Sequence, residues 1–100
     1  MVFWERMETK LGFDWDEANI QHLARHKLTP EEFEQAVLRD PILVGYENVD
    51  GEDRWTGLGA TDSLRVLVLV FTIRGGCVRA VTAYDADKKR AEAFWKERGQ

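Results

Sequence analysis

The stretch that decides the fold covers residues 64–83 and reads LRVLVLVFTIRGGCVRAVTA. Two runs rich in Val, Leu and Ile flank Gly75-Gly76, which is the composition of two strands joined by a tight turn. The first run, Arg65 to Ile73, is apolar without alternation, so we expect a central strand that is covered on both faces. The second run, Cys77 to Tyr84, is predicted to be its antiparallel neighbour.

Two further strands are predicted before this pair. Residues 42–47 and 54–60 have the composition of strands, and Asp50-Gly51 supplies a turn between them. Gly57 and Gly59 interrupt the second of these strands, which is typical of a bulge or of close packing. The four strands together predict an antiparallel meander, with residues 13–15 as a candidate for a short edge strand.

Two helices are predicted before the strands. Asp14 or Asp16 can cap a first helix that ends near His26, and Asp14 and Glu17 have the spacing of a capping box. The motif Thr29-Pro30-Glu31-Glu32 starts a second helix, because Thr is a good N-cap, Pro fits the first helical position and acids suit the first turn.

A last helix is predicted over residues 86–98, with Asp85 as its cap and Gly99 as its stop. The order helix, helix, four strands, helix predicts an α+β domain with its helices on one face of an antiparallel sheet. We expect a single domain over residues 13–98 and an N-terminal extension over residues 1–12.

The bulk properties limit the classes of protein. One hundred residues suffice for one small domain. No apolar run approaches the roughly 20 residues that span a bilayer, so no membrane partner is expected. The single cysteine, Cys77, agrees with a reducing cytosol, and the first residues lack the apolar block of a signal peptide, so a cytoplasmic location is expected. The net charge of −4 means that the chain as a whole does not attract polyanions.

Both histidines of the chain, His22 and His26, stand one helical turn apart. Three interpretations remain open. The pair provides two ligands of a metal site, although such a site needs at least a third ligand and no HExxH or CxxC pattern is present. The rings pack at the border of helix and sheet. Alternatively, they perform acid–base chemistry, because an imidazole exchanges a proton near neutral pH.

Several arginines lie at strand ends or inside strands. Antiparallel neighbours can gather guanidinium groups on one face of a sheet, where these groups suit phosphate oxygens. The alternative is that they are solvated and paired with Glu47, Glu52 and Asp53. The arginines concerned are Arg54, Arg65, Arg74 and Arg79, with Arg25 beside His26. The last helix, with Lys88-Lys89-Arg90 among acids, has the mixed charge of a solvated face.

Three stretches together resemble the BrnT family of toxins. They are WDEANIQHLARHKLTPEEFEQAVLRDP at residues 15–41, DRWTGLGAT at residues 53–61, and the strand pair quoted first. The resemblance covers about residues 13–98. It implies a RelE-like ribonuclease fold and a toxin of a type II toxin–antitoxin module that cleaves RNA without a metal or another cofactor. It also implies a cognate antitoxin that holds the toxin inactive and commonly has a DNA-binding domain. The toxin is then expected to contact DNA only indirectly, through the antitoxin.

The resemblance also implies roles for particular residues. Metal-free cleavage needs help for the attacking 2′-hydroxyl, cations around the phosphorane-like transition state and a proton for the leaving 5′-oxygen. By position, the implied catalytic residues are His22, His26, Arg54, Arg79 and Tyr84, and the implied substrate-binding residues are Arg25, Arg74 and Lys88. Related sequences have arginine at the place of Tyr84 and glycine at the place of Lys27, where a left-handed backbone is expected.

Two other functions remain open at this point. One is a catalytically impaired toxin homologue that has kept the fold and acts by binding a protein partner. The other is a small metal-binding domain that uses His22 and His26 as ligands.

Overall fold

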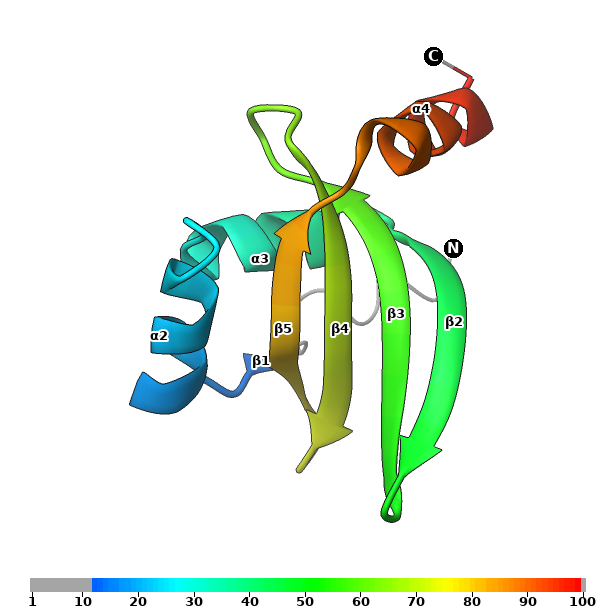
Figure 1. Cartoon of the computed structure of the whole chain (residues 1–100). Coiled ribbons are helices and arrows are strands. Elements are labelled where there is room, and N and C mark those ends of the chain that lie inside the picture. Colours follow the sequence, from blue (N-terminus) through cyan, green and yellow to red (C-terminus); the bar gives the residue numbers. More distant parts are fainter. Residues whose placement is uncertain (1–11, 100) are drawn as a thin grey trace.

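The computed structural model describes residues 12–99, which form an α+β fold of three helices and a five-stranded sheet (Figure 1). The elements in chain order are β1 (Gly12–Phe13), α2 (Glu17–Ala24), α3 (Pro30–Leu38), β2 (Ile42–Val49), β3 (Glu52–Ala60), β4 (Val66–Arg74), β5 (Cys77–Asp85) and α4 (Lys88–Glu97). The predicted class and order of helices and main strands are confirmed. No helix within residues 12–99 is long and apolar enough to cross a membrane.

The sheet has the strand order β1-β5-β4-β3-β2. Strands β2 to β5 form the predicted antiparallel meander. The candidate edge strand at residues 13–15 is found as the short strand β1, one residue earlier, and it lies parallel to β5 with Gly12 opposite Cys77, so the sheet has five strands and is mixed rather than purely antiparallel. The sequence contains no signal for this pairing, because a strand of two residues is too short to show alternation.

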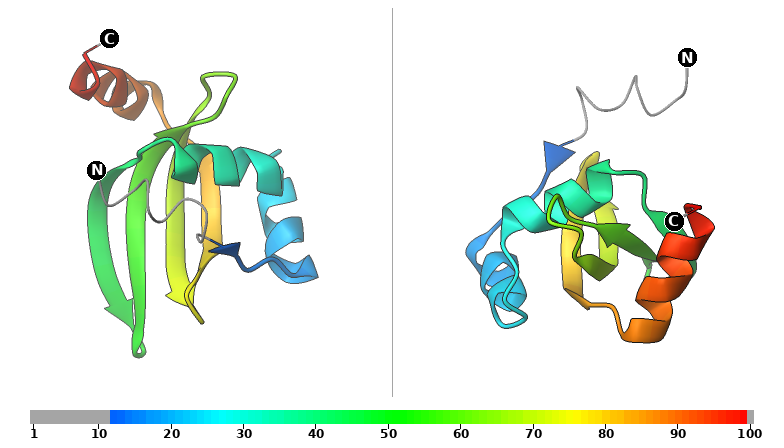
Figure 2. Two further views of the ribbon diagram at one scale, coloured as in Figure 1. Left: turned by 180° about the vertical axis from the view of Figure 1, so that it is seen from behind. Right: turned by 90° about the horizontal axis from the view of Figure 1, so that it is seen from above.

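The helices cover both faces of the sheet (Figure 2). On one face, Leu67 and Leu69 of β4 join a core with Phe33 of α3, and on the other, Val68 packs in a cluster with Phe94 of α4. The prediction that β4 is central and covered on both faces is confirmed. The prediction that all helices lie on one face is wrong, because α4 packs on the opposite face of the sheet from α3. The apolar pattern of β4 predicts that both faces are covered, but it does not predict which helix covers which face.

The helix caps explain where the helices begin. Thr29 caps α3 as predicted, and Glu32 completes a capping box with it. Helix α2 is capped by Asp16, whose partner in the capping box is Asn19, so the box lies two residues later than predicted. Asp87 rather than Asp85 caps α4. The carboxylate of Asp85 is therefore available for a contact described below.

Helix α3 lies very close to β3 at one glycine. A Cβ atom added to Gly59 would lie 2.6 Å from the carbonyl oxygen of Ala36 in α3. Real Cβ atoms essentially never approach backbone this closely, so only glycine fits here. The close packing that the sequence predicted for this strand is confirmed.

Candidate functional site

One face of the sheet gathers most of the residues that the sequence analysis singled out. The strand register pairs Thr72 with Arg79, Val70 with Thr82 and Val68 with Tyr84. Residues that are paired across two strands point to the same face, so all of these share the face on which Val68 contacts α4. In β3, Thr56 pairs with Val70, and Arg54 two residues away also points to this side. We call this surface the α4 face; its residues are Arg54, Thr56, Val68, Val70, Thr72, Arg79, Thr82 and Tyr84.

A β-bulge in β5 makes this grouping possible. The register passes from Thr82, opposite Val70, directly to Ala80, opposite Phe71, so Val81 is an additional residue in the strand. A regular strand would put Arg79 and Thr82 on opposite faces, because they are three residues apart. The bulge puts both on the α4 face.

Three aromatic rings lie in a row beside this face. The ring centroids of His22 and His26 are 5.7 Å apart, and those of His26 and Tyr84 are 6.1 Å apart. His22 is held in place, because its Nε2 lies 2.9 Å from Oγ1 of Thr82. His26 is exposed, and within residues 12–99 its ring makes no hydrogen bond. The structure thus brings together three of the five predicted catalytic residues.

Arg65 fixes the backbone on which His26 lies. Its guanidinium donates to the carbonyl oxygens of His26 and Lys27, at 3.2 and 2.9 Å, and to both carboxylate oxygens of Asp85. Lys27 has the left-handed backbone that was expected, with φ of 59°. The hydrogen bonds from Arg65 are the main reason that the pKa of Asp85 is lowered. Arg65 therefore joins the end of α2 to the end of β5.

Arg79 lies on the α4 face, but it is already paired with acids. Its Nη2 lies 2.6 Å from Oδ2 of Asp16, and its Nη1 lies 3.5 Å from Oδ2 of Asp14. Its side chain is only 17 % exposed. The backbone N–H of Asn19 and the guanidinium of Arg79 both donate to Asp16, and these bonds lower the pKa of that carboxyl group.

Arg54 and Arg74 share one carboxylate. Nε of Arg54 lies 3.1 Å from Oε1 of Glu52, and Nη2 of Arg74 lies 3.0 Å from Oε2 of the same group. Hydrogen bonds from Arg54 and then Arg74 lower the pKa of Glu52. The predicted pairing of these arginines with Glu52 is confirmed. Asp53 instead accepts hydrogen bonds from Tyr46 and Asn48.

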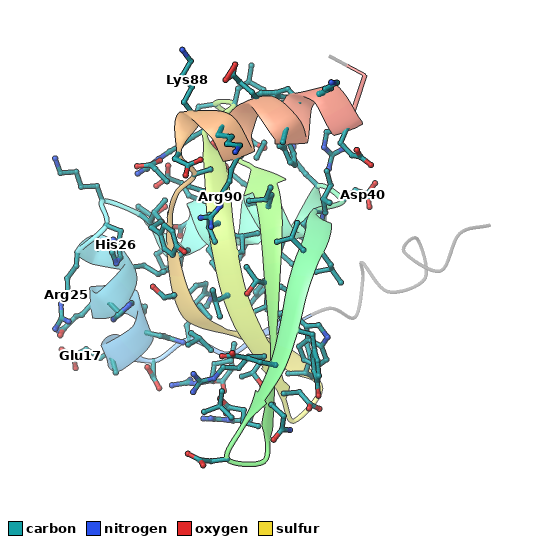
Figure 3. The ribbon with its side chains drawn as sticks, turned by 45° about the vertical axis from the view of Figure 1, so that its right-hand side comes forward. Glu17, Arg25, His26, Asp40, Lys88 and Arg90 are labelled. Carbon is teal, nitrogen blue, oxygen red and sulfur yellow. The ribbon has the colours of Figure 1, made fainter. Side chains whose placement is uncertain are left out.

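The remaining predicted residues are not brought to this face. Figure 3 shows Arg25 pointing away from the sheet at the far side of α2, and Lys88 pointing away from the sheet at the start of α4. Arg90 points from α4 toward the sheet. It lines a pocket of about 160 Å³ together with Val44, Thr56, Leu58, Val68 and Tyr84. Arg90 was not predicted as a site residue, because its place in a mixed-charge run resembles that of a solvated residue.

The histidines are not part of a larger group of metal ligands in the described structure. Within residues 12–99, no group of three or more His, Cys, Asp or Glu side chains is arranged to hold a metal ion. The two imidazoles face instead a hydroxyl group, that of Thr82, and the ring of Tyr84.

Comparison with known proteins adds an independent observation. A model of the family described as "Ribonuclease toxin, BrnT, of type II toxin-antitoxin system" matches residues 15–90. That range contains the two histidines, the whole of the α4 face and Arg90. No curated protein matches the chain.

Proposed function

Because this chain belongs to the BrnT family of ribonuclease toxins of type II toxin–antitoxin systems, we propose that its α4 face is the surface that cleaves RNA. The observation that carries this proposal is the row of His22, His26 and Tyr84, together with the position of Arg54 and Arg79 on the same face of the sheet as Tyr84. Proton exchange and charge stabilisation are the two tasks of RNA cleavage by a ribose hydroxyl, and both kinds of group are present.

In the proposed reaction, the 2′-hydroxyl of a ribose attacks the adjacent phosphorus. A new bond forms between O2′ and phosphorus, the bond from phosphorus to the leaving 5′-oxygen breaks, and a 2′,3′-cyclic phosphate results. His26 is the group assigned to proton exchange, because its ring is exposed and makes no hydrogen bond within residues 12–99. Its neutral ring accepts the proton of the 2′-hydroxyl, and the resulting imidazolium gives a proton to the leaving 5′-oxygen. His22, bonded to Thr82, orients the substrate phosphate. No step in this scheme needs a metal.

Charge stabilisation is assigned to the polar groups around the row of rings. The hydroxyl of Tyr84 donates a hydrogen bond to a phosphate oxygen. Arg54 and Arg79 stabilise the negative charge that grows on the phosphorane-like transition state. Because Glu52, Asp14 and Asp16 already pair with these arginines, part of the positive charge is compensated before RNA arrives.

A type II toxin–antitoxin family implies a cognate antitoxin protein as partner. Our proposal adds that this antitoxin has a DNA-binding domain, so the toxin meets DNA only through it. It also includes RNA as the substrate, a RelE-like arrangement of the fold and the cytoplasm as the location. The family match favours a toxin over the impaired homologue considered above.

The decisive experiment is an RNA cleavage assay in the presence of EDTA. The purified protein should cleave single-stranded RNA under these conditions, and His26→Ala should lower the rate by about 100-fold or more. Gln21→Ala is the matched control, since Gln21 is exposed on the same helix and, within residues 12–99, its side chain forms a hydrogen bond only with Glu17. Folded protein that leaves RNA intact, or a His26→Ala variant as fast as the control, would contradict the proposal.

A further inference from the structure

A small pocket on the α4 face lies between the sheet and α4. Its apolar part comes from Val44 of β2, Leu58 of β3 and Val68 of β4. Thr56, Tyr84 and Arg90 add polar atoms, and Arg90 reaches in from the helix (Figure 3). The pocket volume of about 160 Å³ is of the order of the volume of one planar ring system. Among the described residues that the proposed reaction uses, only Tyr84 lines it.

Within the described part of the chain, Arg90 differs from Arg54 and Arg79 in having no acidic partner. Arg54 and Arg79 both make ion pairs with carboxylates. The guanidinium of Arg90 makes no ion pair with any side chain of residues 12–99. Its donors are therefore available to a ligand, and they are arranged in a planar fork that fits two neighbouring acceptors.

The pocket adjoins the proposed reaction centre. Tyr84 lines the pocket, and the centroid of the same ring is 6.1 Å from that of His26. A ligand in the pocket therefore lies next to the group assigned to proton exchange. A single nucleotide can bridge such a separation, with its base in the pocket and its phosphate beside the histidines.

We propose that this pocket binds one unpaired nucleobase next to the scissile phosphate and that Arg90 recognises the edge of that base; the inference rests on the proposed function. The apolar strand residues contact the face of the base, and the ring of Tyr84 offers an aromatic contact, as is common for unpaired bases in RNA complexes. Guanine is the base with two adjacent acceptors, O6 and N7, that an arginine fork matches. The expected preference is therefore for guanine.

The test measures binding with RNA that cannot be cleaved. Short oligoribonucleotides carry 2′-O-methyl groups throughout, which block attack by the 2′-hydroxyl, and differ only in one central base. Fluorescence anisotropy should show about tenfold tighter binding of the guanine oligomer. Both Arg90→Ala and Arg90→Lys should remove this preference, because lysine keeps the charge but lacks the fork. Lys96→Gln, a loss of positive charge on the same helix, should keep it.

A second variant protects the test against a folding defect. Thr56→Val removes one hydroxyl from the pocket with little change in shape, and it should weaken binding of the preferred oligomer several-fold while leaving the other oligomers unaffected. Circular dichroism verifies that each variant is folded.

The outcomes separate this inference from the proposed function. Cleavage by the wild-type protein without any base preference in binding overturns the pocket and leaves the function intact. Base preference that depends on Arg90, without cleavage, supports the pocket and contradicts the function. An Arg90→Lys variant that keeps the full preference overturns the assignment to the guanidinium fork, because a single ammonium group would then suffice to recognise the base. Failure to bind any oligomer also overturns it.

Discussion

The guanidinium of Arg65 donates a hydrogen bond of 3.2 Å to the main-chain carbonyl oxygen of His26. The same side chain binds Asp85, the residue directly after Tyr84. Arg65 therefore connects the two segments that supply the row of rings, although it points at their backbone and at Asp85 rather than at the rings themselves. We regard it as a positioning residue.

Arg65→Ala should lower RNA cleavage by about tenfold or more, because the turn that carries His26 loses its anchor. The free energy of unfolding should fall by about 1–3 kcal/mol, which is typical of hydrogen bonds to charged groups. Arg65→Lys should recover part of the rate, since it restores the charge without the fork. NMR signals of the His26 ring provide the readout that separates positioning from stability. A folded Arg65→Ala protein with unchanged ring signals and rate would refute the role.

Glu52→Gln should strengthen RNA binding several-fold. It removes the carboxylate that Arg54 and Arg74 share, so that two guanidinium groups become available to phosphates. The slope of log K against log salt concentration should become steeper by about one unit or more. Glu31→Gln is the control, because it makes the same change of net charge on α3, on the other face of the sheet. Equal effects of the two substitutions would show that net charge alone is responsible.

Asp16→Asn should remove a pH-dependent part of the stability. The pKa of Asp16 is lowered from its ordinary value of 3.8, first by the N–H of Asn19 and then by Arg79. A carboxyl group with a lowered pKa stabilises the fold above its unfolded pKa, and this contribution is lost as the pH falls through the folded pKa. Asparagine still caps α2, so the substitution mainly removes the charge.

The measurement is the thermal midpoint of both proteins as a function of pH. Wild type should be the more stable at about pH 6, and the difference should shrink as the pH falls below 3.8. A difference that stays constant down to the acid limit would mean that the charge of Asp16 is not the cause.

Tyr84→Phe tests the hydroxyl of Tyr84 separately from its ring. Phenylalanine keeps the ring beside His26 and loses only the donor assigned to the phosphate. The rate constant of cleavage at saturating RNA should fall by about tenfold or more, while binding of uncleavable RNA stays within a factor of two. Equal losses in rate and in binding would indicate instead that the hydroxyl acts in binding.

Gly59→Ala should destabilise the fold by about 1–3 kcal/mol, because its Cβ would meet the backbone oxygen of Ala36 at 2.6 Å. Gly45→Ala is the matched control, since it lies in the neighbouring strand β2 and its Cβ would make an ordinary contact of 3.6 Å with Thr56. Chemical denaturation measures both. Similar stabilities of the two variants would show that α3 can move away from the sheet at little cost.

Those parts of the fold that depend on local chemistry were predictable from the sequence. The capping box at Thr29 and the turn at Gly75-Gly76 depend on residues within a few positions of one another. The parallel pairing of β1 and the face taken by α4 were not predictable, because they depend on contacts between distant segments.

The same distinction applies to the candidate site. The spacing of one helical turn between His22 and His26 was evident from the sequence. The position of Tyr84 beside them could not be predicted, because it depends on how β5 packs against α2. Arg79 was expected to be a cation for RNA, whereas its neutralising partner Asp16 is far away in the sequence and was expected only to cap a helix. Arg90 could not be distinguished from its charged neighbours in the sequence, because its contribution to the pocket depends on which side of α4 faces the sheet.

The bulge at Val81 has a consequence for comparing relatives of this chain. Whether Arg79 and Tyr84 share a face depends on whether the number of residues between them is odd or even, once the additional residue is discounted. Loss of Val81 alone would leave the side chains of Arg79 and Tyr84 on the face that they share now. An insertion or deletion of one residue elsewhere between them would instead turn one of these two side chains toward the opposite face of the sheet. Aligned sequences that differ in length at this position can therefore present the same surface, and sequences of equal length can present different ones.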